Sequence, residues 1–327
     1  MMQFDRIALG RQAKELGFVR DTFEKVCRLA EILKFMERDT LLSQTLALKG
    51  GTAINLTIFD LPRLSVDIDL DFSQNLPRAE MLEQRGIITE RISKYMAASG
   101  YSLSLKSKKY HALDSFVYEY TNAGGMKDNL KIEINYMLRA HALEVGKRAV
   151  KLPWLDSELT VLSVAPIEIF ASKIVALLNR TAPRDLFDLY NMQKFHLFDE
   201  SEEPMLRKCV MLYSAIGSDT VPDSFNFENI SKLPQYRIKT DLIPVLRREE
   251  HFNLKEAQEQ TITYLSDLLK PQETELNFWA AFKCAEYRPE LLFDDADILS
   301  RIQEHPMAMW KCGGRQKEHG ELQHGRE

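Results

Sequence analysis

Three aspartates alternate with apolar residues in the segment Val66–Phe72, which reads VDIDLDF. Alternation with a period of two predicts a β-strand, and it places Asp67, Asp69 and Asp71 on one face of that strand. Neighbouring carboxylates repel one another, so such a face is either well solvated or neutralised by a cation. Mg²⁺ or Mn²⁺ would suit this position, because hard divalent cations bind clustered carboxylates and triphosphate oxygens.

A pair of glycines precedes this strand in the segment Lys49-Gly50-Gly51-Thr52. Glycine adopts backbone conformations closed to other residues and lets a phosphate approach the main chain. Thr52 stands where a helix is expected to begin, so its hydroxyl and the first N–H groups of that helix would form an anion site. Lys49 adds a positive charge beside it. A phosphate-binding loop followed by a metal-binding acidic strand is what phosphoryl or nucleotidyl transfer requires.

Each half of this pattern also has a structural explanation. Gly-Gly-Thr most often forms an ordinary turn. Aspartates at alternate positions are also found on the solvated face of an edge strand. The two halves in this order and at this spacing are far more specific than either alone.

The pattern resembles the GG[ST]…DxD signature of the polymerase-β-like nucleotidyltransferase superfamily. More closely, KGGTAxNL followed by RxSxDxDLDF resembles the AbiEii family, the toxins of type IV toxin–antitoxin systems, with Arg63 and Ser65 at that family's Arg and Ser. The resemblance extends over roughly residues 15–200. It implies an α/β (α+β) fold, with a nucleotidyltransferase core built on a small mixed sheet and a helical C-terminal domain. It also implies that Asp67 and Asp69 bind the metal, and that Ser65 belongs to the nucleotide site.

The resemblance further implies a third carboxylate on a strand beside the Asp-x-Asp strand. The run Leu130–Tyr136 alternates as a strand does, and Glu133 is the acid placed to fill this role. In the alternative interpretation, Lys131 and Glu133 simply form the solvated face of that strand.

A second group of charged residues follows in the pattern K-x6-R-x3-R-D-x2-D, formed by Lys173, Arg180, Arg184, Asp185 and Asp188. Helical spacing places Lys173 and Arg180 on one face of a helix. By resemblance, Lys173 would hold the triphosphate or stabilise charge in the transition state, and Arg180 and Arg184 would belong to the nucleotide site. Asp185 or Asp188 would act as a base on the acceptor hydroxyl or orient Lys173 and Arg184. An ion-pair network that only joins two helices is the alternative.

Composition limits the remaining possibilities. The chain has 327 residues, 45% of them hydrophobic and 28% charged, which is typical of a soluble globular protein of two domains. No apolar run reaches the ~20 residues that a bilayer requires, and charges interrupt the N-terminal segment, so a cytoplasmic protein without a secretory signal is expected. Four cysteines and seven histidines form no metal-binding pattern. The net charge of −5 requires any bound RNA to contact a local basic patch.

The candidates for this basic patch are the lysines of segment 106–109 together with basic residues between positions 139 and 151. A scattered, solvated face is the alternative interpretation of the same residues. The predicted domains are residues 1–160 as the nucleotidyltransferase core and residues 161–310 as a mainly helical domain. A polar, glycine-rich tail over residues 311–327 is predicted to be disordered.

The function implied by the resemblance is Mg²⁺-dependent transfer of a nucleotide from an NTP to RNA, with a tRNA 3′ end as the expected acceptor and a block on translation as the result. A genetically linked antitoxin is expected, without a tight complex. Two alternatives remain open at this stage. One is a kinase-like regulator that phosphorylates itself or a partner, with Ser65 as a candidate acceptor. The other is a binding module with a degenerate site.

Overall fold

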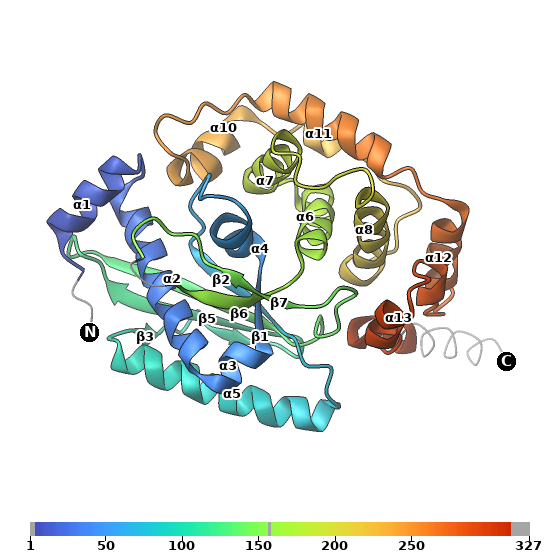
Figure 1. Cartoon of the computed structure of the whole chain (residues 1–327), viewed down its shortest axis with the longest axis horizontal. Coiled ribbons are helices and arrows are strands. Elements are labelled where there is room, and N and C mark those ends of the chain that lie inside the picture. Colours follow the sequence, from blue (N-terminus) through green and yellow to red (C-terminus); the bar gives the residue numbers. More distant parts are fainter. Residues whose placement is uncertain (1–3, 156–157, 315–327) are drawn as a thin grey trace. The chain divides into compact units, whose positions relative to one another are not determined.

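The computed structural model of the chain describes residues 4–155 and 158–314 (Figure 1). The chain divides into two compact units. The first takes in the residues up to Arg139, Val145–Val164 and Ile238–His251, and the second takes in Ala140–Glu144, Ala165–Arg237 and the residues from Phe252 onward. The predicted boundary at residue 160 lies close to the observed change of unit after Val164. In addition, Ala140–Glu144 belongs to the second unit and Ile238–His251 to the first.

One mixed sheet forms the centre of the first unit. In the part of the chain that the structure describes, the sheet has eight strands. Seven follow the order β3-β5-β6-β2-β1-β8-β7, and the eighth, β4, pairs with β5. The β2–β6 and β1–β8 pairs are parallel, and the other pairs are antiparallel. The small mixed sheet predicted from the sequence is therefore confirmed. Its strands are β1 Leu46–Lys49, β2 Asp67–Phe72, β3 Ser102–Leu103, β4 Lys108–Lys109, β5 Leu113–Thr121, β6 Lys127–Asn135, β7 Gly146–Ala149 and β8 Thr160–Ser163.

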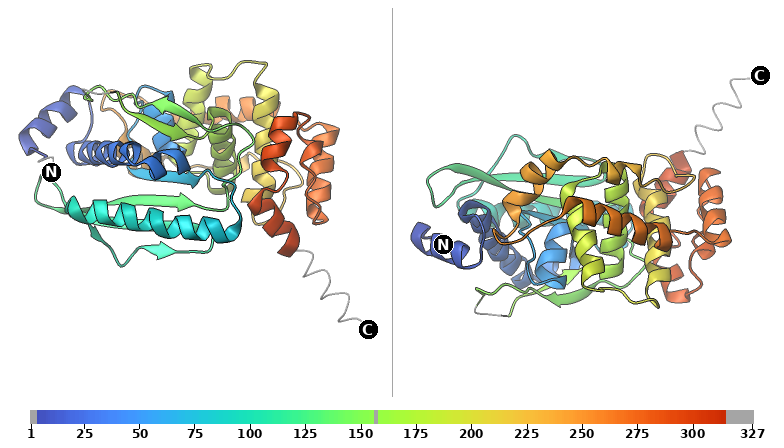
Figure 2. Two further views of the ribbon diagram at one scale, coloured as in Figure 1. Left: turned by 60° about the horizontal axis from the view of Figure 1, so that its bottom comes forward. Right: turned by 90° about the horizontal axis from the view of Figure 1, so that it is seen from above.

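Alternation along the strands gives this sheet an apolar face and a polar face. Buried residues such as Ile68, Ile132 and Phe116 occupy one face, and the half-exposed residues between them occupy the other. Helix α5 packs on the apolar face of β5, because Arg85 of α5 forms an ion pair of 2.7 Å with Asp114, which shares that face with Phe116. In Figure 1 and in the left view of Figure 2, this long helix runs beside the green strands.

The remaining helices of the first unit lie before β1, between β1 and β2, and in the segment Ile238–His251. The helices are α1 Arg6–Glu15, α2 Arg20–Arg38, α3 Thr40–Thr45, α4 Gly50–Ala53, the π-helical turn η1 Ile54–Ile58, α5 Arg78–Ala98, the π-helical turn η2 Ile238–Leu242 and the 3₁₀ turn η3 Ile243–Val245.

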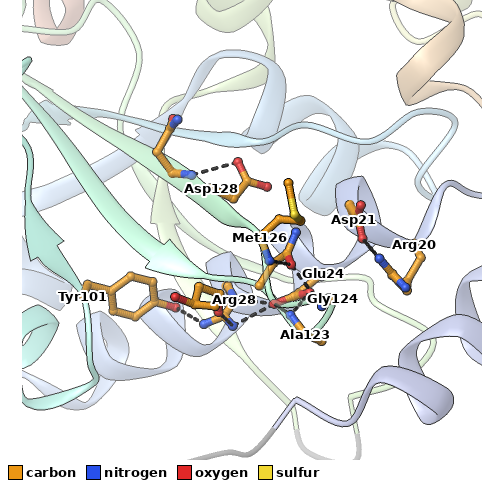
Figure 3. A network of polar contacts seen from close by, with 12 residues as sticks. Arg20, Asp21, Glu24, Arg28, Tyr101, Ala123, Gly124, Met126 and Asp128 are labelled. Carbon is orange, nitrogen blue, oxygen red and sulfur yellow. Dashed lines mark hydrogen bonds and ion pairs between the residues drawn. The ribbon is translucent and has the colours of Figure 1, made fainter.

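A buried polar network fixes α2 against the turn between β5 and β6 (Figure 3). Glu24 is fully buried, and its carboxylate accepts hydrogen bonds from the Ala123 backbone N–H at 2.9 Å and from Arg28 at 2.7 Å. Arg28 in turn donates to the Tyr101 hydroxyl at 3.2 Å. Because a buried carboxylate needs such partners to remain charged, this network holds the hairpin and its strands in place.

The segment Ile238–His251 returns from the middle of the sequence to the first unit. The Leu64 N–H donates to the carbonyl of Val245 at 2.8 Å, and the Arg248 N–H donates to the carbonyl of Gly17 at 2.7 Å. These residues were predicted to belong to the helical domain of residues 161–310. The structure shows instead that this segment braces the loop just ahead of β2.

The second unit is helical. Proline occupies the first turn of both α6 and α7, where its missing N–H costs nothing, and the left-handed residue Thr181 separates the two helices. α6 contacts α7 and α8, and α7 contacts α11. The helices are α6 Pro166–Arg180, α7 Pro183–Lys194, α8 Glu203–Gly217, α9 Glu228–Ser231, α10 Gln235–Arg237, α11 Leu254–Leu268, α12 Glu273–Lys283, the 3₁₀ turn η4 Pro289–Leu291 and α13 Ala296–Ile302.

The predicted disordered tail begins too early. Residues 306–314 are helical, and Lys311 donates to the carbonyls of Ala215 and Ser218 at the end of α8. A lysine at a helix C-terminus satisfies carbonyls that lack a partner within the helix, so this contact anchors residue 311 to α8. The rest of the predicted tail, residues 315–327, lies outside the described residues.

Candidate active site

Four strands of the first unit align their site residues in one row across the sheet. Lys49 of β1 is paired with Asp69 of β2, Asp69 with Glu133 of β6, and Glu133 with Ser115 of β5. Residues paired across neighbouring strands point to the same side of a sheet, so all four side chains lie on its polar face. We call these residues the cross-strand row. It places the predicted third carboxylate directly beside the Asp-x-Asp strand.

Gly50 lies directly against Asp69. A Cβ atom at Gly50 would stand 2.5 Å from Oδ2 of Asp69, and Gly50 has a φ of +65°, which L-amino acids with side chains rarely adopt. Both the close approach and the backbone conformation require glycine here. The glycine motif and the acidic strand are thus in direct contact and belong to one site.

The structure places Thr52 inside the helix rather than at its start. α4 begins at Gly50, two residues before the predicted start, and Lys49 is its N-cap residue. Thr52 is fully buried, its Oγ1 lies 2.9 Å from Ser65 Oγ, and it donates to the carbonyl of Asp67. These contacts favour a role for the Thr52 hydroxyl in supporting β2 over the predicted contact with phosphate.

Ser65 is also buried, with 9% of its surface exposed. Its hydroxyl faces Thr52, so both polar side chains of this pair are directed inward. A phosphate acceptor must reach the nucleotide, and this placement does not favour Ser65 as the site of self-phosphorylation.

Two buried residues support the glycine pair and were not predicted as site residues. A Cβ at Gly51 would stand 2.8 Å from Nη2 of Arg63, a side chain with 2% exposure. Asn55 joins the two segments, because its amide donates to the Gly51 carbonyl at 2.7 Å and its oxygen accepts from the Arg63 N–H at 3.3 Å. The sequence signal for Asn55 was a polar residue in the apolar run Ala53–Leu56.

Lys49 and Asp71 form an ion pair of 2.5 Å between Nζ and Oδ1. Asp71 is buried while Lys49 is partly exposed, so the pair holds the ammonium group of Lys49 in place and leaves part of its side chain at the surface. Asp71 therefore contacts Lys49 of β1, beside the two acids predicted to bind a metal.

The chemistry of the donor set fits a magnesium ion held by two carboxylates. Asp67 and Asp69 are half-exposed on the polar face of β2. Mg²⁺ commonly binds one or two carboxylates and completes its octahedron with water and phosphate oxygens. Within residues 4–155 and 158–314, no group of three or more His, Cys, Asp or Glu side chains converges closely enough to hold a metal. The carboxylate of Glu133 is engaged by Lys131 at 2.8 Å, so its role as third ligand stays a prediction.

The second charged group is assembled within the second unit. Lys173 contacts Asp185 at 2.9 Å and Asp188 at 3.2 Å, and Arg180 contacts Asp185 at 2.8 Å. Both aspartates are 1% exposed, whereas Arg180 is 64% exposed. Burial raises the pKa of Asp185, but the charge of Lys173 and the hydrogen bond from Arg180 outweigh it and hold the pKa below its ordinary value. Asp185 therefore stays ionised and orients two cations. Arg184, in the first turn of α7, is half-buried.

The predicted basic patch does not form one surface. Lys106, Lys108 and Lys109 are exposed at the β4 end of the sheet, whereas Lys147 lies on β7 at the opposite edge. Arg139, in the segment that follows β6, is half-buried, and burial lowers the pKa of its guanidinium. The predicted set is therefore divided into two groups, one at β4 and one at β7, where Lys147 and Lys151 are exposed.

A cavity of about 500 Å³ in the second unit lies away from these charged groups. It is lined by Val175 and Asn179 of α6, which point away from Lys173 and Arg180 on the same helix, and by polar residues that follow α8. No predicted site residue lines it.

The fold of this chain is similar to that of a solved structure. The chain is similar to MenT4, a nucleotidyltransferase toxin from Mycobacterium tuberculosis H37Rv, with a TM-score of 0.65 and 17% identity, over 91% of this chain and 99% of that one. A second similarity, to the CdnC:HORMA-deltaN complex of E. coli MS115-1, has a TM-score of 0.25 and 12% identity, over 85% of this chain and 96% of that one, and carries no argument. The chain therefore shares the fold of that toxin.

The family follows from the sequence match. The family model described as nucleotidyl transferase AbiEii toxin, type IV TA system, matches residues 34–282, which include both charged groups. The chain therefore belongs to the AbiEii family and is an enzyme of the nucleotidyltransferase class, and the resemblance seen in Leu48–Phe72 is confirmed. No curated protein matches the chain. None of the helices described between residues 4 and 314 is long and apolar enough to cross a membrane.

Proposed function

We propose that this toxin transfers a nucleotide from an NTP to an RNA acceptor, with a tRNA 3′ end as the acceptor, in a reaction that requires Mg²⁺ or Mn²⁺. The observation that supports this most directly is the contact of Gly50 with Asp69 within the cross-strand row. A backbone able to approach phosphate and a carboxylate able to hold a metal are brought together at one point. Modification of the tRNA end would block translation.

The residues of the first unit have distinct roles in this proposal. Gly50 and Gly51 let the main chain contact the β- and γ-phosphates, and Lys49 offsets their charge. Asp67 and Asp69 would hold the metal, which when bound neutralises charge on the phosphates and on the leaving pyrophosphate. Thr52 and Ser65 fix β2 against α4, so that the carboxylates and the glycines keep their spacing.

The second unit contributes cations held by buried carboxylates. Lys173 and Arg180 bind the triphosphate and stabilise negative charge as the α-phosphorus is attacked, with Arg184 close by in sequence. Asp185 acts as a positioning residue, because its oxygens are engaged by Lys173 and Arg180. Asp188 supports Lys173 from the next turn of α7. An ionised carboxylate with a lowered pKa is a weak base, so we assign Asp185 to orientation rather than to proton removal.

The type IV family implies an antitoxin partner. We propose that this antitoxin forms no tight complex with the toxin and that both act in the cytoplasm. Co-purification of the toxin and its genetically linked antitoxin from cells that produce both would contradict the first part.

The test uses purified protein, bulk tRNA, Mg²⁺ and each NTP in turn, labelled at the α-phosphate, with the RNA resolved on a denaturing gel. The matched control is the Asp67→Asn/Asp69→Asn variant, which removes both charges with little change in volume. We expect one NTP to label the tRNA band in the wild-type reaction only. An unlabelled tRNA band with all NTPs would contradict the proposal.

A further inference from the structure

The cross-strand row continues beyond Ser115 to the β4 edge of the sheet. Ser115 of β5 is paired with Lys108 of β4, so Lys108 lies on the same polar face as Asp69 and Glu133. Strands lie about 4.8 Å apart, which places the Cα of Lys108 about 14 Å from that of Asp69. The extended row thus has a cation at each end, Lys49 and Lys108, with two carboxylates and a hydroxyl between them.

The two ends of this row are not equivalent. The glycine pair and Lys49 adjoin the β1 end, where the proposed function places the triphosphate and its leaving pyrophosphate. In phosphoryl transfer the attacking and leaving oxygens stand roughly in line on opposite sides of the phosphorus. The acceptor must therefore approach from the β6–β5–β4 side.

The surface on that side suits a nucleic-acid strand. Ser115 and Val117 are half-exposed on the polar face of β5, and Lys108 is exposed. No acidic residue occurs between Ser102 and Leu113, and Lys108 has no ion pair within the described part of the chain. Tyr110, which is 51% exposed, presents an aromatic ring at the end of β4. Lysines that contact phosphates and aromatic rings that stack on bases are the usual elements of single-strand recognition.

The turn that carries Tyr110 is held rigidly. Arg85 of α5 donates to the carbonyl of Tyr110 at 2.7 Å and to the carbonyl of His111 at 3.1 Å, while its guanidinium is also bound by Asp114. A fixed turn presents Lys108 and Tyr110 in a defined position relative to the sheet.

We infer that the polar face from Glu133 to Lys108 is the track along which the single-stranded 3′ end of the RNA acceptor reaches the active site, with Lys108 bound to a backbone phosphate. This inference rests on the proposed function and adds the direction of acceptor entry. At about 3.4 Å per stacked nucleotide, the distance to Lys108 corresponds to about four nucleotides from the reacting hydroxyl.

The test measures binding of fluorescent single-stranded RNA of about eight nucleotides by anisotropy over a range of salt concentrations. Lys108→Met should weaken binding several-fold and reduce the slope of log K against log salt by about 0.7, the loss of one phosphate contact. The matched control is Lys109→Met. Lys109 is the adjacent lysine of β4, but it is paired with Asp114 on the opposite face and lies over the Phe116 ring, so its loss should change binding less than about twofold.

Acceptor length gives a second, internal control. RNA of about two nucleotides cannot reach Lys108, so wild-type protein and Lys108→Met should bind it equally and use it equally as an acceptor. The proposed acceptor track would be contradicted if the Lys108 and Lys109 substitutions weakened binding of the longer RNA equally, or if neither changed it. Absence of nucleotide transfer by wild-type protein would instead contradict the proposed function, while a specific loss of RNA binding in Lys108→Met would still support the track.

Discussion

Gly50 stands so close to Asp69 that any side chain at Gly50 would meet the carboxylate, with 2.5 Å between a Cβ and Oδ2. This contact joins the two motifs of the sequence, which are separated by 18 positions along the chain, since the first motif begins at Lys49 and the second at Asp67. The spacing of the motifs is therefore a consequence of the fold. β1 and β2 are antiparallel neighbours, so the glycines that follow β1 lie beside the start of β2.

Replacement of Gly50 by alanine tests this contact. The added Cβ and the positive φ should destabilise the protein by about 1–2 kcal/mol. Displacement of Asp69 should lower the transfer rate about 100-fold, because reacting groups tolerate little misplacement. Urea unfolding and a transfer assay measure the two effects.

The matched control for this variant is Gly86→Ala in α5. A Cβ at Gly86 meets nothing within 4 Å, so alanine should stabilise that helix by about 1 kcal/mol and leave transfer unchanged. A Gly50→Ala protein with wild-type stability and rate would show that the close approach does not exist.

Thr52 distinguishes a structural role from a phosphate contact. Thr52→Val keeps the shape of the side chain but leaves the buried groups of Ser65 and Asp67 without their partner, which should cost about 1–3 kcal/mol. Thr52→Ser restores the hydroxyl and should recover most of the loss. An increase in the KM for NTP with unchanged stability in Thr52→Val would instead identify Thr52 as a phosphate ligand.

Much of this site follows from sequence alone, because the period-two alternation of β2 fixes the face on which Asp67 and Asp69 lie. The contact between the glycines and β2 could not be predicted in detail, since it depends on where α4 begins. The burial of Thr52 follows from that same two-residue difference. The split of the basic residues between the two sheet edges could not be predicted, because it depends on the strand order, which places β7 and β4 at opposite edges.

Glu133 and Lys131 provide a test of the third carboxylate. Their ion pair is partly exposed, with side-chain exposures of 25% and 38%, so its loss should change stability by about 1 kcal/mol or less. If Glu133 contributes to metal binding, Glu133→Gln should lower the transfer rate at least ~10-fold, whereas Lys131→Met should have a much smaller effect. Equal losses in the two variants would show that Glu133 serves only as the partner of Lys131.

Asp185 should make stability depend on pH. Because its folded-state pKa is lowered, the stabilisation is complete above the ordinary pKa of 3.8 and is lost as the pH falls through the folded-state value. Asp185→Asn should therefore destabilise the protein at neutral pH, by about 3 kcal/mol because Lys173 retains Asp188. The difference between the two proteins should shrink below about pH 4 in urea unfolding experiments.

Asp223→Asn is the control for this effect. Asp223 is exposed and pairs with Lys283 at the surface, so its substitution should change stability by no more than about 0.5 kcal/mol at either pH. A constant difference between wild-type protein and Asp185→Asn over the whole pH range would contradict the lowered pKa.

The central claim is that the nucleotide, and not the terminal phosphate, is transferred. Its most direct test supplies the same NTP in two labelled forms, one at the α-phosphate and one at the γ-phosphate, to protein and tRNA with Mg²⁺. Nucleotidyl transfer predicts α-label in the RNA and γ-label in released pyrophosphate, both abolished in Asp67→Asn/Asp69→Asn. Label from the γ-phosphate on the protein or on the RNA, without α-label in the RNA, would contradict the account and identify a phosphoryl transferase.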